Sequence, residues 1–259
     1  MTEFGLIGKV LGHSFSKEWF TNKFHEEGID ARYLNFELPS ITEIKNLIEE
    51  HPNLVGFNVT IPYKKEIIPY LDYISPEASA IGAVNVVKID PISKILKGFN
   101  TDVMGFDESI APHIRTWHKH AFILGTGGVS KAVDFALTQR DIKTTLVSRH
   151  KKIGCITYED FHELSKILPS EGGWTRLMNQ NPSIIVNCTP LGMFPDNDTY
   201  PDIPYQLLTE NHLLFDCVYN PTETLFLKYG AKQGADTVNG LEMLHLQAKY
   251  AWEIWNSQI

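Results

Sequence analysis

Short apolar runs of β character alternate with helical patterns along the whole chain, and this alternation constrains the fold more than any other feature. In the first hundred residues it predicts, in chain order, a strand at 4–7, a helix at 17–27, a strand at 32–38, a helix at 40–48, a strand at 54–60, a helix at 75–81 and a strand at 83–87. Strands separated by helices are typical of parallel βαβ units with buried sheets. We therefore expect an α/β protein.

The alternation resumes after residue 102 with clearer signals. It predicts strands at 121–124, 144–148, 184–186 and 213–218, and helices at 128–140, 158–168 and 240–259. We expect two α/β domains, one of residues 1–102 and one of residues 103–239. The closing helix, residues 240–259, has one apolar face and is expected to return to the first domain.

The charge balance limits the partners of the chain. It has 23 Lys and Arg against 31 Asp and Glu, a net charge of −8, which argues against a nucleic-acid or anionic membrane surface. No apolar run approaches the roughly 20 residues of a membrane span, and the first residues lack a signal-peptide pattern. The three cysteines and ten histidines show no metal-binding spacing. We expect a cytoplasmic monomer or homodimer with reduced thiols and no metal ion.

A glycine-rich turn follows the strand at 121–124. The turn and the start of the next helix consist of Gly125, Thr126, Gly127, Gly128 and Val129. Glycine permits a tight turn and close approach of the backbone to a pyrophosphate, and the amides at a helix N-terminus supply donors. The segment predicts a Rossmann-like, doubly wound dinucleotide-binding domain over residues 103–239, with an ordinary turn between strand and helix as the alternative.

The end of the second strand of this domain indicates which dinucleotide it binds. An NAD site has Asp or Glu there to hold the ribose 2′-hydroxyl. This chain instead has Ser148, Arg149, His150 and Lys151, followed by Lys152. A carboxylate would repel a 2′-phosphate, whereas a guanidinium binds it with paired donors. The cluster predicts NADP(H) as the cofactor, with a solvated basic loop as the alternative.

Seven short segments form a series that covers nearly the whole chain. They are Gly12-His13-Ser14-Phe15-Ser16, Asn58-Val59-Thr60-Ile61-Pro62-Tyr63-Lys64, Gly82-Ala83-Val84-Asn85, Asn100-Thr101-Asp102, Asn187-Cys188-Thr189-Pro190, Asp216-x-x-Tyr219-x-Pro221 and Gly240-x-x-Met243-Leu244-x-x-Gln247. In this order they resemble the shikimate dehydrogenase family. The resemblance implies an N-terminal substrate domain, an NADP-binding domain, and reversible reduction of 3-dehydroshikimate to shikimate with NADPH, a step of chorismate and aromatic amino-acid biosynthesis.

The resemblance also implies a set of substrate-binding residues, namely Ser14, Ser16, Asn58, Thr60, Asn85, Tyr219 and Gln247. A dehydroshikimate-like ligand presents a carboxylate, a ketone and hydroxyl groups, for which hydroxyl and amide side chains are suitable partners. Residues two apart in an extended segment point to the same side, as the two serines would, and as Asn58 and Thr60 would. By themselves the two serines could cap a helix, and Asn58 and Thr60 could lie on an exposed strand face. Asn85 could be a turn residue, and Tyr219 could belong to the core.

Lys64 and Asp102 are the catalytic pair that the resemblance implies. Hydride addition to a ketone develops alkoxide charge, and a lysine supplies the proton that this charge needs. We expect Lys64 to donate a proton in reduction and to accept it in oxidation, while Asp102 orients Lys64 and binds a hydroxyl. A solvated lysine and a helix-capping carboxylate are the alternatives. Thr189, Cys217 and Gly240 are expected to line the nicotinamide end, mainly through backbone groups.

Two other functions remain open from the sequence. A quinate/shikimate dehydrogenase would accept either ligand, because quinate differs by a hydroxyl where shikimate has a ring double bond. A catalytically silent NADP-binding sensor would keep the fold, although binding alone does not require a proton-transfer pair such as Lys64 and Asp102.

Overall fold

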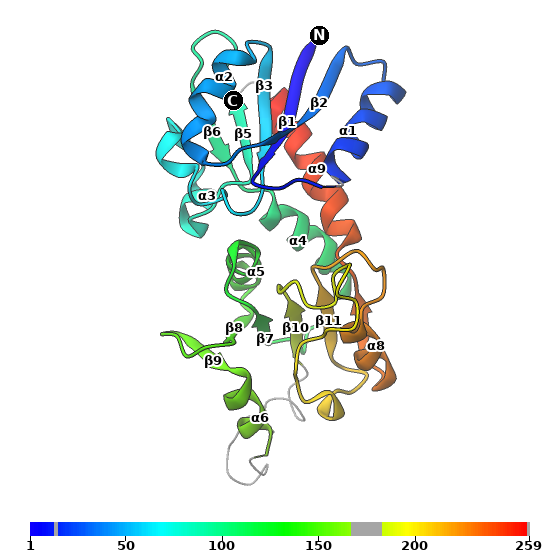
Figure 1. Ribbon diagram of the computed structural model, residues 1–259. Helices are drawn as coiled ribbons and strands as arrows, with labels where there is room; N and C mark the ends of the chain where they lie inside the picture. Colours follow the sequence, from blue (N-terminus) through cyan, green and yellow to red (C-terminus); the bar gives the residue numbers. More distant parts are fainter. Residues whose placement is uncertain (13–14, 167–182, 258–259) are drawn as a thin grey trace. The chain divides into compact units, whose positions relative to one another are not determined.

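The computed structural model describes residues 1–12, 15–166 and 183–257 (Figure 1). The chain divides into two compact units, Met1–Asp102 with Leu246–Ile259, and Val103–His245. Each unit contains a six-stranded sheet. The α/β class, the presence of two domains and the return of the last helix to the first of them agree with the sequence prediction. None of the helices in the described ranges combines the length and the apolar composition that a bilayer crossing requires.

The first unit is built on sheet A, whose strand order is β2-β1-β3-β5-β6-β4. Its elements are β1 (Thr2–Gly8), α1 (Phe15–Glu26), β2 (Ala31–Glu37), η1 (Ile41–Glu43), α2 (Ile44–Glu50), β3 (Leu54–Val59), η2 (Ile68–Tyr70), β4 (Tyr73–Ile74), α3 (Pro76–Ile81), β5 (Val86–Ile89), β6 (Leu96–Phe99) and the C-terminal part of α9 (Leu241–Asn256). Local sequence sets many of these boundaries. At α3, for example, Ser75 accepts a hydrogen bond from the amide of Ala78, Pro76 occupies the first turn, and Gly82 ends the helix with a φ of 67°.

The direction of β5 differs from the expected parallel arrangement. β5 pairs antiparallel with β3 and β6, while β1 pairs parallel with β2 and β3. The reversal arises because the segment with β4 and α3 returns the chain to the edge at which β3 ended, after which residues 90–95 turn back into β6. The carboxyl ends of β1, β3 and β6 and the amino end of β5 therefore share one edge of sheet A.

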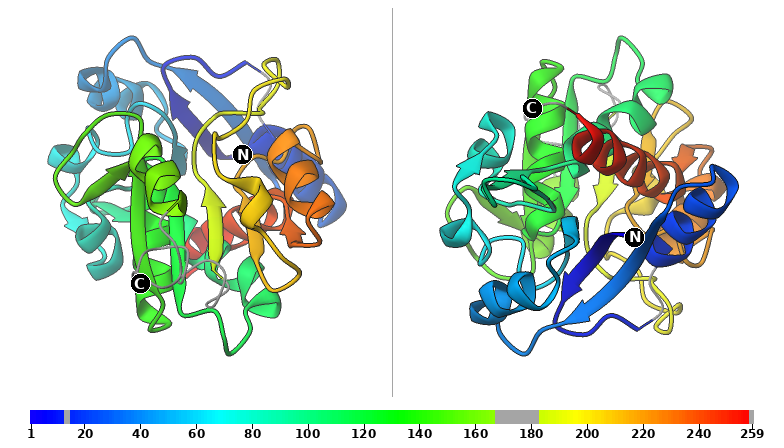
Figure 2. Two further views of the ribbon diagram at one scale, coloured as in Figure 1. Left: turned by 90° about the horizontal axis from the view of Figure 1, so that it is seen from below. Right: turned by 90° about the horizontal axis from the view of Figure 1, so that it is seen from above.

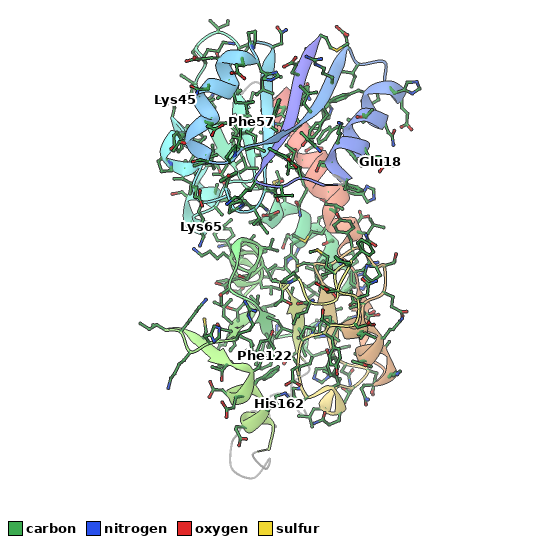
Figure 3. The ribbon with its side chains drawn as sticks, in the orientation of Figure 1. Glu18, Lys45, Phe57, Lys65, Phe122 and His162 are labelled. Atoms are coloured by element: carbon green, nitrogen blue, oxygen red, sulfur yellow. The ribbon has the colours of Figure 1, made fainter. Side chains whose placement is uncertain are left out.

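Helices α1 and α9 lie side by side on one face of sheet A (Figures 1 and 2). Phe20 of α1 and Trp255 of α9 have ring centroids 5.2 Å apart, and Trp255 lies 4.8 Å from the ring of Phe4 in β1. Gly56 of β3 permits this approach, because a Cβ there would lie 2.4 Å from the indole. Helices α2 and α3 cover the other face through a separate apolar cluster that contains Phe57 of β3, labelled in Figure 3.

The second unit is built on sheet B, in which all strand pairs are parallel and the order is β12-β11-β10-β7-β8-β9. Its elements are α4 (Asp102–Ile110), η3 (Ala111–His113), β7 (His120–Leu124), α5 (Gly128–Gln139), β8 (Lys143–Ser148), β9 (Cys155–Thr157), α6 (Tyr158–Lys166), β10 (Ile184–Asn187), η5 (Tyr205–Leu207), β11 (Leu213–Asp216), α8 (Leu225–Lys232) and β12 (Asp236–Val238). If β7 to β12 are numbered 1 to 6 and the order is read from β9, the sheet has the 3-2-1-4-5-6 order of Rossmann-like sheets. The order reverses between β7 and β10, so their carboxyl ends mark the topological switch point.

Both faces of sheet B are covered by helices. Ile123 of β7 belongs to an apolar cluster with side chains of α4 and α5, whereas its neighbour Phe122 belongs to a cluster with α6 and α8 (Figure 3). Successive strand residues point to opposite faces, which explains why one strand feeds two clusters. The continuous apolar run of β7 follows from this double coverage, because every side chain of the strand must be buried.

Some element boundaries differ from those expected. The strand expected at 83–87 begins at Val86, and the strand expected at 213–218 ends at Asp216. At the second position the cause is local, because the Asp216 carboxylate accepts from the amide of Val218 and turns the chain. The helix expected over 158–168 is described as far as Lys166, and its expected end lies outside the described residues.

Candidate active site

The expected residues of the first unit gather at the edge of sheet A where β1, β3 and β6 end. Thr60 directly follows β3, Asn85 directly precedes β5, and Asp102 lies three residues beyond the end of β6. They share an edge because β5 runs antiparallel to its neighbours. Open α/β sheets bind ligands beyond the carboxyl ends of their strands. This edge is therefore the candidate site of the first unit.

Lys64 and Asp102 form an ion pair at this edge. Lys64 Nζ donates to Asp102 Oδ2 over 2.7 Å, and the side chains are 16% and 1% exposed. The backbone of Lys64 is fixed by its carbonyl, which accepts from the amide of Val84 at 2.7 Å, and by the buried side chain of Tyr63 beside it. Lys65, in contrast, is exposed (Figure 3). A partly exposed ammonium group held by a buried carboxylate is suited to giving a proton to a bound ligand.

Asn85 joins this pair to the strand ends. Its Nδ2 donates to Asp102 Oδ1 at 2.9 Å and to Thr101 Oγ1 at 3.2 Å, and its Oδ1 accepts from the amide of Thr101 at 2.8 Å. The Asp102 amide donates to Asn100 Oδ1 at 3.0 Å. The two carboxylate oxygens of Asp102 thus accept hydrogen bonds from Asn85 and Lys64. A carboxylate that only capped α4 would instead accept from backbone amides of that helix.

Tyr33 of β2 links two further residues of the expected site. Its hydroxyl donates to Asn58 Oδ1 at 2.8 Å and is hydrogen-bonded to the side chain of Ser16. Burial raises the pKa of the Tyr33 phenol well above its ordinary value, so Tyr33 remains a neutral donor. Asn58 Nδ2 also donates to the carbonyl of Asn85 at 3.4 Å. Ser16 and Asn58 are therefore connected to the polar group around Asp102.

The other expected substrate residues are placed as follows. Thr60 continues the ladder of β3, with its amide donating to the carbonyl of Ile7 at 2.9 Å. Gln247 is half-buried on the part of α9 that belongs to the first unit. Tyr219 follows β11 in the second unit, and burial raises the pKa of its phenol. Ser14 lies outside the described residues.

In the second unit the glycine turn lies at the switch point of sheet B. Gly125 follows β7 with a φ of 108°, and a Cβ on it would lie 3.2 Å from the carbonyl oxygen of Cys188. Glycine therefore satisfies both the backbone conformation and the close contact. Gly127 caps α5, which begins at Gly128, and a Cβ on Gly127 would meet no atom within 4 Å. A helix N-terminus whose capping residue is open to solvent fits a pyrophosphate.

The basic segment after β8 contacts the glycine turn through one of its cations. Lys152 Nζ donates to the hydroxyl of Thr126 at 2.8 Å. Arg149, His150 and Lys151 are exposed. Cations with exposed side chains next to a helix N-terminus fit a second, peripheral phosphate.

Two further residues expected to bind the cofactor, Ser148 and Val129, lie at the base of these segments. Ser148 ends β8, and its Oγ accepts from the amide of His150 at 3.3 Å. Val129 packs on the apolar cluster beneath the first turn of α5. Ser148 is buried and Val129 is half-buried, and both help to fix the backbone that carries the basic segment and the turn.

A buried polar network organises the ends of β10 and β11. The Asp216 carboxylate accepts from Asn187 Nδ2 at 2.9 Å and from Thr224 Oγ1 at 2.6 Å. Burial raises the pKa of Asp216 to about 6. Asn187 Oδ1 accepts from the amide and the hydroxyl of Thr189 at 3.0 and 2.6 Å. The network therefore fixes Thr189, one of the residues expected at the nicotinamide end.

Cys217 and Gly240 are in close backbone contact beside Asp216. A Cβ on Gly240 would lie 2.4 Å from the carbonyl oxygen of Cys217, so only glycine fits this backbone contact.

Among the described residues, no three His, Cys, Asp or Glu side chains are grouped as a metal ion would require.

Comparison with known proteins identifies the family. Residues 6–87 match the family model of the shikimate dehydrogenase substrate binding domain. The chain is 39% identical over 255 residues to the shikimate dehydrogenase (NADP(+)) of Methanococcus maripaludis, an alignment that covers 97% of this chain and 90% of that relative. The chain belongs to the shikimate dehydrogenase family.

Solved structures of the shikimate dehydrogenase family share the fold described above. Shikimate dehydrogenase 1 from Peptoclostridium difficile is 38% identical with a TM-score of 0.78, over 100% of this chain and 93% of that one. The Thermus thermophilus enzyme in complex with NADP(H) and shikimate is 27% identical with a TM-score of 0.81, over 99% of this chain and 94% of that one. The family predicted from the seven sequence segments is therefore confirmed.

Tyr33 and Lys152 belong to this family member's candidate site although neither was singled out as a site residue from the sequence. Tyr33 lies on the side of β2 opposite to the one whose apolar alternation predicted the strand. Lys152 was visible as part of the basic run, but its contact with Thr126 depends on how the loop between β8 and β9 folds back. Neither contact has a spacing signal in the sequence.

Proposed function

We propose that this chain catalyses the reversible NADPH-dependent reduction of 3-dehydroshikimate to shikimate, a step toward the aromatic amino acids. The observation that carries the proposal is the Lys64–Asp102 ion pair at the carboxyl edge of sheet A, in a chain of the shikimate dehydrogenase family. A protein that only bound NADP would have no use for a buried carboxylate that positions an ammonium group.

Lys64 acts as the acid of the reduction. When bound, NADPH supplies the hydride that reduces the ketone. Lys64 Nζ donates a proton to the oxygen on which alkoxide charge develops, and it accepts that proton in the reverse reaction. Asp102 holds the ammonium group over 2.7 Å and accepts from a ligand hydroxyl, while Asn85 fixes the orientation of the carboxylate.

The hydroxyl and amide side chains of the first unit bind the substrate. We assign the ligand carboxylate to Ser14 and Ser16, because hydroxyl donors suit an anion without adding a competing charge. Asn58, Thr60 and Asn85 are assigned to the hydroxyl groups of the ring. Gln247 and Tyr219 complete the proposed set of substrate residues.

The second unit holds NADP(H). The amides at Gly127 and Gly128 and the hydroxyl of Thr126 are assigned to the pyrophosphate. Arg149 is assigned to the 2′-phosphate with His150 and Lys151, and Lys152 joins this group through its position beside Thr126. Thr189, Cys217 and Gly240 are assigned to the nicotinamide end. Support comes from the absence of an acidic residue at 148–152, where an NAD site needs one.

The decisive experiment measures nicotinamide absorbance with the purified protein in four combinations, shikimate or quinate with NADP or NAD. We expect the highest kcat/KM for shikimate with NADP. Equal kcat/KM for quinate would replace the narrow assignment with a quinate/shikimate dehydrogenase. Turnover with none of the four, by a protein that still binds NADP, would favour a silent sensor.

We also propose that the protein works in the cytoplasm as a monomer or homodimer. The three cysteines are thiols in the structure, which suits a reducing compartment. Cell fractionation and light scattering of the purified protein test the two statements separately. A secreted protein or a larger assembly would contradict them.

A further inference from the structure

Cys188 and Cys217 are far apart in the sequence but adjacent in the second unit. Their Sγ atoms are 3.8 Å apart. Cys188 directly follows β10 and Cys217 directly follows β11, and the last register pair of these strands is Asn187 with Asp216. The two cysteines therefore stand one step beyond a register pair on neighbouring parallel strands.

The backbone at both cysteines continues the strand geometry. The amide of Cys188 donates to the carbonyl of Leu124, and the amide of Cys217 donates to the carbonyl of Asn187, each at 2.9 Å. Neighbouring strands are about 4.8 Å apart, and disulfides join Cα atoms that are about 4.4–6.8 Å apart. The strand spacing therefore lies within the range that disulfides span, and closing the bond from an Sγ–Sγ distance of 3.8 Å to about 2.05 Å requires the two residues to approach each other.

Neither cysteine is fully buried in the second unit. Both residues are half-buried, and both pack against the apolar cluster that includes Val186 and Phe215. They occupy the same face of sheet B, because each lies two residues after one of these cluster members.

We propose that Cys188 and Cys217 form an oxidisable dithiol, which hydrogen peroxide converts into an intramolecular disulfide. One thiolate attacks the O–O bond of peroxide and becomes a sulfenic acid, and the departing hydroxide takes up a proton as water. The second thiolate attacks the sulfenic sulfur, forms the S–S bond and expels a second hydroxide. Two thiols and one hydrogen peroxide thus give one disulfide and two waters.

The disulfide closes beside the residues assigned to the cofactor. Gly125 lies against the carbonyl of Cys188, and Gly240 lies against the carbonyl of Cys217. Thr189 directly follows Cys188 in the chain. A bond that moves the two cysteines therefore shifts backbone at the switch point, and we expect it to weaken NADP(H) binding. This consequence rests on the proposed function, whereas formation of the disulfide does not.

Cys155 provides a comparison within the same protein. It lies in β9, which is separated from β10 in sheet B by β8 and β7. The strand order therefore keeps Cys155 away from both members of the dithiol. Cys155→Ser removes a thiol without touching the proposed pair.

The first experiment treats the purified full-length protein with hydrogen peroxide, then counts its thiols after denaturation and measures its intact mass. We expect the count to fall from three to one, the mass to fall by about 2 Da, and dithiothreitol to reverse both. Peptide mapping should find Cys188 joined to Cys217. A link that involves Cys155, or three thiols that survive in a peroxide-treated protein, would overturn the proposal.

Variants and an arsenical test the pairing independently of oxidation. Phenylarsine oxide bridges neighbouring thiols, so it should bind wild type and Cys155→Ser at one equivalent. It should bind Cys188→Ser about a hundredfold more weakly, because only one sulfur remains to hold it. Equal binding to Cys188→Ser would show that the two sulfurs do not act together, which contradicts the dithiol.

NADPH titration and dehydrogenase assays before and after peroxide treatment test the consequence. Wild type and Cys155→Ser should lose NADPH binding and recover it with dithiothreitol, whereas Cys188→Ser should keep its own untreated level. A disulfide that leaves NADPH binding unchanged would overturn the link to the cofactor. A protein that forms the disulfide but has no dehydrogenase activity when reduced would refute the proposed function and leave the dithiol standing.

Discussion

Lys64 and Lys65 are consecutive residues with different surroundings. Lys64 is 16% exposed and bonded to Asp102, whereas Lys65 is exposed. Lys64→Ala removes the proposed proton donor, so we expect kcat for shikimate oxidation to fall by roughly two to four orders of magnitude. Lys65→Ala removes the same charge one residue away and should leave kcat nearly unchanged.

The stability of the Lys64→Ala variant must be measured with its activity. Removing Lys64 leaves the carboxylate of Asp102 buried without its cation, which costs about 3–5 kcal/mol in typical buried pairs. Circular dichroism at the assay temperature shows whether the variant is folded. A folded Lys64→Ala protein with undiminished kcat would remove Lys64 from the mechanism.

Asp216 makes the stability of the second unit depend on pH. Burial raises the pKa of this carboxyl from 3.8 to about 6 in the folded protein. Between these values the folded chain keeps a proton that the unfolded chain has released, so the free energy of unfolding falls as the pH rises through this window. The shift corresponds to a loss on the order of 3 kcal/mol. This loss of stability is complete once the pH exceeds the pKa of Asp216 in the folded protein.

Asp216→Asn tests this dependence, because asparagine keeps one acceptor for Asn187 and Val218 but does not titrate. Denaturant unfolding between pH 4 and pH 7 should show that wild type loses more stability than the variant over this range. Asp198→Asn, in an exposed loop, is the control and should follow wild type. Parallel curves for wild type and Asp216→Asn would contradict the raised pKa.

Single residues differed in how far the sequence could place them. Lys64, Asn85 and Asp102 stand in motifs that identify them one by one, and in the structure their side chains are hydrogen-bonded to one another. The contact between Cys188 and Cys217 has no such signal, because it arises only when β10 and β11 are neighbours in register. Motifs therefore single out candidate residues, whereas a contact between distant residues outside any motif depends on the strand order.

The loop between β8 and β9 carries the cofactor preference at the scale of an element. Arg149 is exposed there, free of the buried packing that fixes Ser148. Arg149→Ala should weaken NADP binding about ten- to a hundredfold, because hydrogen bonds to a charged phosphate are lost, while NAD binding changes little. Fluorescence titration with both cofactors measures the two constants.

A control with the same change of charge separates the local effect from the overall field. Lys143 is exposed at the amino end of β8, the opposite end of the strand from Arg149. Lys143→Ala should leave the ratio of the NADP and NAD constants unchanged. An equal loss for both cofactors in Arg149→Ala would contradict the assignment of this residue to the 2′-phosphate.

Elements with strong periodicity were predictable, and short ones were not. The buried runs of β7 and β10 and the capped helix α3 were expected near their observed places. β4 has two residues and β9 and β12 have three each, which is too short for a periodic signal. The reversed direction of β5 was missed for a different reason, because it depends on where the preceding connection ends and local sequence does not encode that position.

The whole molecule is assembled from discontinuous sequence. The first unit needs Leu246–Ile259 from the far end of the chain, while the second unit is the continuous stretch Val103–His245. Trp255 fills the space above Gly56, and its indole N–H donates to the carbonyl of Val87 at 3.0 Å. Trp255 in α9 is therefore part of the core that supports the candidate substrate site.

Truncation after residue 245 tests this dependence. The shortened chain loses Ala248, Ala251 and Trp255 from the cluster that covers one face of sheet A. Loss of a single buried tryptophan typically costs about 3–5 kcal/mol, so we expect the first unit to unfold. Hydrogen exchange should show lost protection in residues 1–102 and retained protection in residues 103–245.

Trp255→Phe in the full-length chain is the matched control, because it shortens one side chain and keeps the helix. It should retain protection of both units, with a lower melting temperature than wild type, since the hydrogen bond to Val87 and part of the buried ring are lost. Full protection of residues 1–102 in the truncated chain would mean that sheet A is stable without α9. The substrate side of the molecule would then not depend on the end of the chain, contrary to the packing of Trp255 on Phe4 and Phe20.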